Sequence, residues 1–214
     1  MRGGDFLMLA TRSQRKSAMI VVDMEASGLD VVKHGLLSVG AAEFENPGNT
    51  FYGECRLWDG AHIDPESLAV NGFTEAQARD PKKQTDGELM KSFLEWSSAC
   101  TEKTLAGQNP SADRDLLRAA AHRYHFDWQF AFRTVDLHSV AYMHMTKRGV
   151  AVPLSHGHSA LSLDKILVYC GLPEEPRPHN GLCGALLEAE CFSRLFYDKP
   201  LLPDYEKYPI PWTT

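Results

Sequence analysis

The segment MIVVDMEASGLD, residues 19–30, combines the pattern of a buried strand with two closely spaced carboxylates. Its first four residues favour a β-strand that leads directly into Asp23 and ends before the break at Gly28. Glu25 follows Asp23 by two positions, so the two side chains of a strand would point to the same face. Carboxylate oxygens are the ligands that hard divalent cations prefer. The segment predicts a metal site at a strand end, although two solvated carboxylates would give the same pattern.

Composition narrows the class of protein. With 214 residues, the chain suffices for one sizeable α/β core, and no apolar run approaches the roughly 18 residues of a transmembrane helix. The five cysteines are widely spread and never form C-x-x-C, which argues against a disulfide framework or zinc cage and favours a reducing cytoplasm. A net charge of −6 argues against a protein that coats nucleic acid through bulk positive charge. It is compatible with an enzyme that binds phosphate through cations.

Periodicity and turn signals predict the order of elements. Residues 36–45 and 50–58 form a hairpin around the turn signal NPGN, and Asp64 and Thr74 cap two short helices separated by Gly72. Helices follow over 86–100, 111–125, 138–145, 162–171 and 179–196, with short strands at 104–108 and 132–137. This order predicts an α/β fold with a mixed central sheet between helices.

The chain reads as one domain with two extensions. We expect residues 1–18 to be a disordered leader, residues 19–198 the domain, and residues 199–214 a proline-rich tail packed on it. His156 and His158 lie in SHGHS, which fits a polar loop before a helix better than a metal site, because no cysteine or acidic partner is nearby. Asp136 and Asp164 lie at strand and helix ends, where capping explains them.

Three further motifs follow the first one along the chain. They are NGFTEAQA at 71–78, LAGQNPSADRDLL at 105–117 and PHNGLCGALLEAE at 178–190. With Asp23-x-Glu25, their order and spacing resemble the DEDDh 3′–5′ exonucleases of the ribonuclease H-like fold, a group that includes polymerase proofreading subunits, oligoribonuclease and ribonuclease T. The resemblance extends over residues 19–198.

The resemblance implies a chemistry for particular residues. It implies a ribonuclease H-like mixed sheet and an enzyme that releases nucleoside 5′-monophosphates from single-stranded DNA or RNA 3′ ends. Two Mg²⁺ or Mn²⁺ ions would be held by Asp23, Glu25 and Asp113, and His179 would act as general base on the attacking water. A specialist for very short RNAs, similar to oligoribonuclease, is the nearest alternative.

The third motif departs from the family pattern H-x-x-x-x-D. Five residues after His179 the chain has Gly184 in place of the fourth acidic ligand. Glu188 lies roughly 40° from Gly184 around the helix and one turn further on. We therefore hypothesise that Glu188 replaces the missing aspartate and that Gly184 clears its path; an exposed, solvated Glu188 is the alternative. If the ligand is lost, the chain is a degenerate exonuclease fold that binds nucleic acid ends or a protein partner without cleavage.

The resemblance also implies contacts to the substrate. The backbone around Met24, Ala26 and Ser27 would contact the terminal nucleotide, and Leu29 or Met24 would pack on its base. Two other residues have alternatives that stay open: Phe73 is either a stacking or a core aromatic, and Asn109 is either a substrate contact or a turn residue that positions the Asp113 loop. Family members are often dimers, so a homodimer is an open alternative, and no membrane partner is expected.

Overall fold

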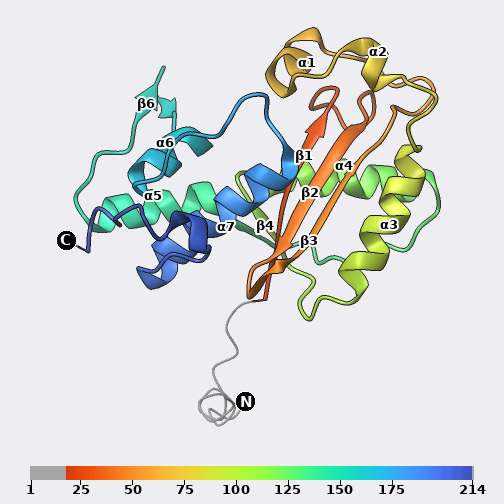
Figure 1. Ribbon diagram of the computed structural model, residues 1–214. Coiled ribbons are helices and arrows are strands. Elements are labelled where there is room, and N and C mark those ends of the chain that lie inside the picture. The colour runs from red at the N-terminus through yellow and green to blue at the C-terminus, as the bar shows by residue number, and fades with distance from the viewer. Residues whose placement is uncertain (1–17, 214) are drawn as a thin grey trace, which may run out of the picture.

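The computed structural model describes residues 18–213, and its centre is a five-stranded mixed sheet (Figure 1). The strand order is β3-β2-β1-β4-β5. Because β1 pairs antiparallel with β2 and parallel with β4, the strand that carries Asp23 and Glu25 lies in the middle of the sheet. The strands are β1 Ile20–Ala26, β2 Leu36–Glu43, β3 Asn46–Glu54, β4 Leu105–Gly107 and β5 Thr134–Asp136, and β6 Leu154–Ser155 and β7 His158–Ser159 form a separate hairpin.

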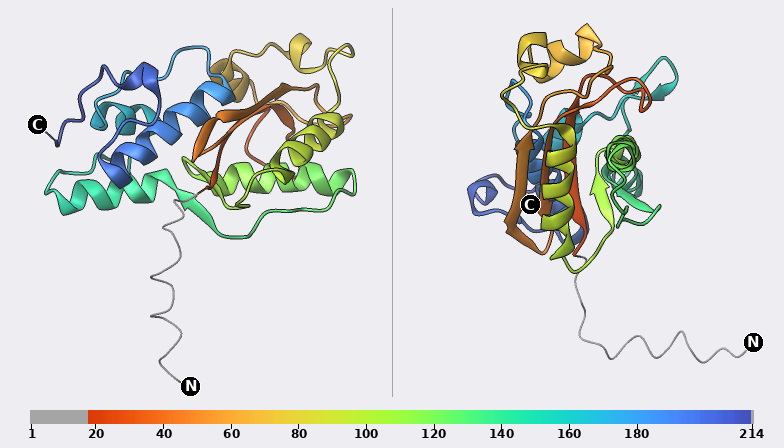
Figure 2. Two further views of the ribbon diagram at one scale, coloured as in Figure 1. Left: turned by 60° about the horizontal axis from the view of Figure 1, so that its bottom comes forward. Right: turned by 90° about the vertical axis from the view of Figure 1, so that its right-hand side faces the viewer.

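Helices cover both faces of this sheet (Figure 2). Their bounds are α1 Pro65–Asn71, α2 Glu75–Ala78, α3 Asp86–Ser98, α4 Pro110–Arg123, α5 Leu137–Lys147, α6 Leu163–Tyr169 and α7 Gly181–Tyr197, with a 3-10 turn at Pro203–Tyr205. Within residues 18–213, no helix has the length and apolar character needed to cross a bilayer.

The alternation of side chains along β1 sets the direction of the acidic pair. Ile20 and Val22 belong to the core formed with α3 and α4, whereas Val21 belongs to the core formed with α5, α6 and α7. Asp23 and Glu25 continue the series of Val21, because alternate residues of a strand share a face. Both carboxylates are therefore directed to the α7 side of the sheet.

The α7 helix packs closely on β1 and β2 through glycines. A Cβ on Gly40 would lie 2.0 Å from the carbonyl carbon of Gly181, and a Cβ on Gly181 would lie 2.7 Å from the Asp23 carbonyl oxygen. No side chain fits at these contacts, so the start of the helix lies directly against the strand that carries Asp23. The glycine face of α7 is therefore inside, and Leu182 and Leu186 are half-buried.

The turn between β2 and β3 lies earlier than predicted. Residues 44–45 form the turn, and the NPGN signal belongs to the start of β3. Phe44 is buried against the rings of Phe192 and Phe196, each 6.4 Å away between centroids, which fixes the chain reversal there. Pro47 is tolerated because β3 is an edge strand, where a missing N–H breaks no ladder.

Helix caps follow the sequence signals at several places. The Asp64 side chain accepts from the Glu66 N–H at 2.9 Å, Gly72 ends α1 in a left-handed conformation, and Thr74 forms a capping box with Gln77. Asp136 caps α5 as expected. Asp164 was expected to cap as well, but its carboxylate accepts from the Glu175 N–H and from Arg177, so it fixes the segment before α7.

A buried ion pair in α7 anchors the C-terminal segment. The Glu190 carboxylate accepts from Arg194 Nε at 2.6 Å and from the N–H groups of Leu201 and Leu202. Arg194 in turn donates to the carbonyl oxygens of Tyr205 and Tyr208. The chain after α7 is thereby held on the domain. Residues 1–17, most of the expected leader, lie outside the described residues.

Candidate functional site

Four carboxylates from three elements face one another where α7 crosses the end of β1. Asp23 and Glu25 come from β1, Asp113 from the first turn of α4, and Glu188 from the middle of α7. Asp23 is partly exposed, whereas Glu25, Asp113 and Glu188 are 8%, 9% and 2% exposed. All four predicted acidic residues thus lie in one cluster, with one partly open side.

Glu188 is directed toward the end of β4. Its Oε1 accepts a hydrogen bond from the Gln108 backbone N–H at 3.1 Å, and its buried Oε2 has no hydrogen-bond partner among residues 18–213. The loop that follows β4 carries Asn109 in a left-handed conformation, with φ 54° and ψ 47°, and the Asn109 N–H donates to Asp136 at 3.1 Å. This turn begins α4 and places Asp113 beside Glu188.

The electrostatics of the cluster are those of buried like charges. Burial, followed by the charges of Glu188, Asp113, Glu25 and Glu175, raises the pKa of Asp23 well above its usual value. Burial and then Glu175 and Asp113 raise the pKa of Glu25 to about 7, and burial raises the pKa of Asp113 to about 7. The pKa of Glu188 is raised for the same reasons. Nearby positive charge would relieve this repulsion.

The histidine of the third motif lies beside a glutamate that the sequence analysis missed. His179 Nδ1 is 3.2 Å from Glu175 Oε2, and the imidazole is 21% and the Glu175 side chain 2% exposed. His179 Nε2 is buried and, within the described chain, has no hydrogen-bond partner. Burial and the Arg177 charge lower the pKa of His179, so its ring is neutral at neutral pH. The signal in the sequence was a glutamate four residues before the histidine.

Gly184 lies against the Asp23 carboxylate. A Cβ at residue 184 would be 1.9 Å from Asp23 Oδ2 and 3.4 Å from Glu175 Oε1. The missing side chain therefore leaves room for the Asp23 carboxylate, and the expectation that Gly184 also clears a path for Glu188 stays a prediction. Within residues 18–213, no group of three or more His, Cys, Asp or Glu side chains is arranged so that it could hold a metal ion as it stands.

Two hollows flank the carboxylates, and Asn71 lines both. The first, of about 360 Å³, is lined by Met24, Glu25, Ala26 and the exposed Leu29. The second, of about 350 Å³, is lined by Phe73, His179 and Tyr52, among others. These hollows bring most of the predicted substrate residues together.

Two of the predicted substrate residues are placed differently. The Ser27 N–H donates to the Gly35 carbonyl and its carbonyl accepts from the Asp64 N–H, while its hydroxyl donates to His62; the residue is fully buried. Asn109 is exposed at the start of α4 and lines neither hollow. Its left-handed backbone is that of a turn residue.

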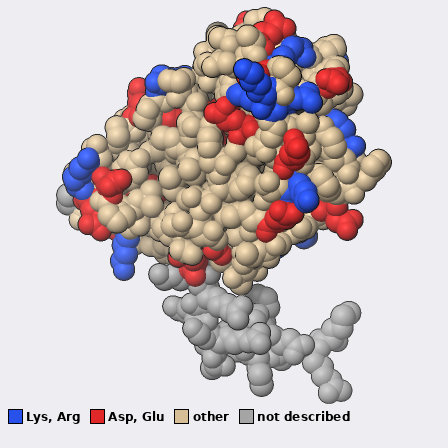
Figure 3. Space-filling view, turned by 45° about the vertical axis from the view of Figure 1, so that its right-hand side comes forward, with Lys and Arg blue, Asp and Glu red and all other residues tan. Residues whose placement is uncertain are grey.

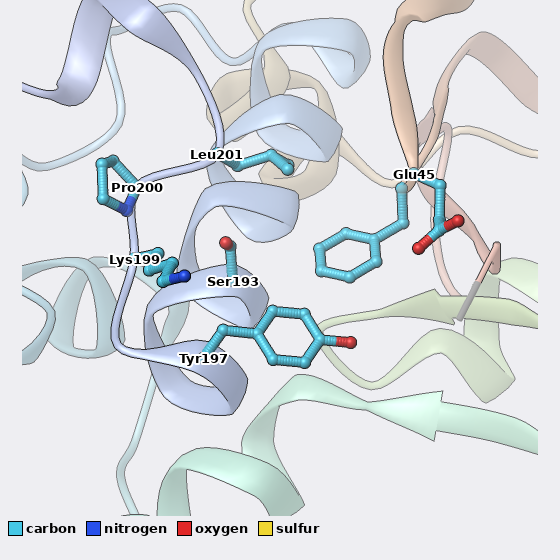
Figure 4. Close-up of a pocket in the computed structure, with 7 residues that line it drawn as sticks. Glu45, Ser193, Tyr197, Lys199, Pro200 and Leu201 are labelled. Atoms are coloured by element: carbon cyan, nitrogen blue, oxygen red, sulfur yellow. The ribbon is translucent and has the colours of Figure 1, made fainter. Parts of the chain in front are cut away.

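A third hollow lies at the other end of the strands (Figure 4). Phe44, Glu45, Ser193 and Tyr197 line it together with the segment 199–201, and none of the clustered carboxylates does. On the face drawn in Figure 3, basic side chains gather near the α1 and α2 end beside acidic ones, and the rest of that face is mixed. The exposed His156 and His158 belong to the β6–β7 hairpin, where a loop was expected.

Comparison with solved structures shows which known proteins share this fold. No protein-family model matches the sequence. E. coli exonuclease I in complex with a dT13 oligonucleotide matches at a TM-score of 0.67 and 16% identity, over 84% of this chain and 41% of that one. The nuclease domain of 3′hExo, a DEDDh family member bound to rAMP, matches at a TM-score of 0.64 and 17% identity, over 89% and 97%.

The chain has the fold of these exonucleases. The predicted α/β class, a ribonuclease H-like mixed sheet between helices, is thereby confirmed. The chain spans about two fifths of exonuclease I, and the 3′hExo nuclease domain is matched over nearly its whole length.

Proposed function

We propose that the protein is a metal-dependent 3′–5′ exonuclease of the DEDDh type, which releases nucleoside 5′-monophosphates from single-stranded DNA or RNA 3′ ends. The observation that carries the proposal is the meeting of Asp23, Glu25, Asp113 and Glu188 at one site, with a buried Glu188 oxygen that has no partner within residues 18–213. The shared fold with exonucleases that bind oligonucleotides and a nucleotide supports the same reading.

The donor set fits two divalent cations such as Mg²⁺ or Mn²⁺. Asp23, Glu25, Asp113 and Glu188 would hold them, because carboxylate oxygens suit these ions and because a cluster of buried carboxylates is destabilised without positive charge. Bound cations of this kind supply charge stabilisation on the phosphate and make water a better nucleophile at neutral pH. In this proposal Glu188 takes the role of the fourth acidic residue.

His179 has the properties of a general base. Its pKa is lowered, so the ring is neutral and accepts a proton at neutral pH. The Glu175 carboxylate, 3.2 Å from Nδ1, favours the tautomer with the proton on Nδ1, which leaves Nε2 as the acceptor. Nε2 is buried and has no protein partner in the described part of the chain, so it is free to take the proton of the attacking water.

The two flanking hollows suit the last nucleotides of a single strand. Met24 and Leu29 offer an apolar surface for the terminal base on one side, and Phe73 offers an aromatic ring on the other. Phe73 is half-buried, and its ring centroid lies 4.8 Å from Lys83 Nζ, which is ion-paired with Glu54 at 2.6 Å. The backbone of Met24 and Ala26 would contact the terminal sugar, with Asn71 between the two hollows.

Digestion of end-labelled oligonucleotides tests this function. Single-stranded DNA and RNA with a 5′ label are incubated with Mg²⁺, Mn²⁺ or EDTA, and wild type is compared with Asp23→Asn, Glu188→Gln and His179→Ala. Glu95→Gln, an exposed acid on α3, is the matched control.

A ladder that shortens from the 3′ end only with metal, and is lost in Asp23→Asn and Glu188→Gln but kept in the control, is the expected result. Oligonucleotide binding by the wild type without any cleavage would contradict it. That outcome would identify a degenerate exonuclease fold that binds nucleic acid ends, for which Gly184 is the motivating observation.

A further inference from the structure

Glu175 is a buried carboxylate that no motif of the sequence assigned. It lies between α6 and α7, and its side chain is 2% exposed. Its Oε1 is buried and lacks a hydrogen-bond partner anywhere in residues 18–213. A buried charged oxygen of this kind is costly unless something pairs with it. Its position therefore calls for a partner that the protein does not supply.

The segment that carries Glu175 is fixed in place. The Glu175 N–H donates to Asp164 Oδ1 at 3.2 Å, and Arg177 Nη2 donates to Asp164 Oδ2 at 3.3 Å. Asp164 lies in the first turn of α6, so one carboxylate ties this segment to a helix. Two hydrogen bonds to Asp164, one from the Glu175 backbone and one from the Arg177 side chain, thus hold the segment so that Glu175 points inward.

The Glu175 carboxylate reaches the space that a side chain at residue 184 would enter. Glu175 Oε1 lies 3.4 Å, and Asp23 Oδ2 1.9 Å, from the point where a Cβ on Gly184 would be. By contrast, Glu188 Oε2 lies 3.0 Å from the corresponding point at Gly107, on the β4 side of the cluster. The two glutamates thus approach the site from different sides.

The charges of the cluster agree with this position. Among the charged neighbours that raise the pKa of Glu25, Glu175 has the largest effect. The charge of Glu175 also raises the pKa values of Asp23 and Glu188. Its second oxygen, Oε2, faces His179 Nδ1 at 3.2 Å, so one carboxylate links the acidic cluster to the imidazole.

We propose that Glu175 supplies a fifth carboxylate, which reaches from the segment before α7 into the space beside Gly184, and that it binds a divalent cation together with Asp23 and Glu25. The site then has five carboxylates, with Glu188 on the β4 side and Glu175 on the Glu25 side. This inference rests on the proposed metal-dependent function. Through Oε2, the same side chain orients His179.

Calorimetric titration with Mn²⁺ in the absence of nucleic acid tests this role. The full-length wild type is compared with Glu175→Gln, which keeps the shape of the side chain and removes its charge. Glu174→Gln, the exposed neighbour, is the matched control, and His179→Ala removes the partner of Oε2 and leaves the acidic cluster intact. Thermal unfolding in EDTA establishes that each variant is folded.

We expect Glu175→Gln to weaken Mn²⁺ binding by at least about tenfold, and Glu174→Gln and His179→Ala to bind Mn²⁺ within about twofold of wild type. If Glu175→Gln does not fold, Glu175→Asp replaces it, and the same loss is expected because the carboxylate is withdrawn by one methylene.

One outcome would overturn the role of Glu175 and leave the nuclease function standing. In that outcome, wild type binds Mn²⁺ and cleaves oligonucleotides, and Glu175→Gln binds Mn²⁺ as tightly as wild type does. A wild type that binds no Mn²⁺ and cleaves no oligonucleotide would overturn both.

Discussion

Replacing Asp113 with asparagine is expected to abolish cleavage and yet stabilise the metal-free protein. The carboxylate is 9% exposed and lies close to Glu188 and Asp23. Without a cation, its ionised form is unfavourable in the folded state, and the unfolded chain has no such penalty. A neutral amide of the same shape removes the penalty together with the metal ligand.

The pKa of Asp113 gives the size of the effect. Burial raises that pKa from 3.8 to about 7, against the opposing effect of the backbone N–H groups of Asp113 and Met24. A difference of about three pH units at about 1.4 kcal/mol each gives roughly 4 kcal/mol at pH 8, where the carboxylate is ionised in both states. The buried amide NH₂ of asparagine needs a partner, which costs about 1–3 kcal/mol. The net gain is therefore about 1–3 kcal/mol.

Urea unfolding at pH 8 in EDTA measures this gain. The free energy of unfolding of Asp113→Asn is compared with that of wild type and of Asp127→Asn, an exposed aspartate that follows α4. The control is expected to stay within about 0.5 kcal/mol of wild type. A lower free energy of unfolding for Asp113→Asn than for wild type would refute the view that this carboxylate is destabilised without metal.

Three further predictions follow from the same structure. Because the pKa values of Glu25 and Asp113 are each raised to about 7, the folded protein holds more protons than the unfolded chain between about pH 4 and 7. In EDTA, the melting temperature should therefore fall as the pH rises through this window, and Mn²⁺ should reverse the trend. A melting temperature that rises with pH in EDTA would contradict this expectation. Gly184→Ala places a methyl group 1.9 Å from Asp23 Oδ2 and should lower kcat at least about tenfold with the fold intact by circular dichroism; unchanged kcat would show that Asp23 is free to move. Arg194→Met leaves a fully buried carboxylate without its partner and should lower the free energy of unfolding by about 3–5 kcal/mol; a urea-melt change under about 1 kcal/mol would contradict that role.

The sequence predicted the elements whose signals are local. The strand that leads into Asp23, the caps at Asp64 and Thr74, and the break at Gly72 depend on a few neighbouring residues, and the structure confirms them. The acidic pair of β1 was directed correctly to one face because strand alternation is a local rule.

The features that the sequence did not predict depend on contacts between distant segments. The β2–β3 turn shifted because Phe44 packs on α7, and the close approach of α7 to β1 and β2 through glycines is not signalled by the periodicity of apolar residues. Asp164 contacts the Glu175 segment across 11 residues, a pairing that no cap pattern signals. Glu175 itself was missed because its direction depends on that contact. The roles of Glu188 and His179 stay proposals.

A crystal structure with Mn²⁺, analysed by anomalous scattering, tests the central claim most directly. The account predicts two anomalous peaks about 3.5–4 Å apart, with Asp23 in contact with both and with Glu188 and Glu175 on opposite sides. No peak among these carboxylates, or a peak confined to His156 and His158, would contradict it.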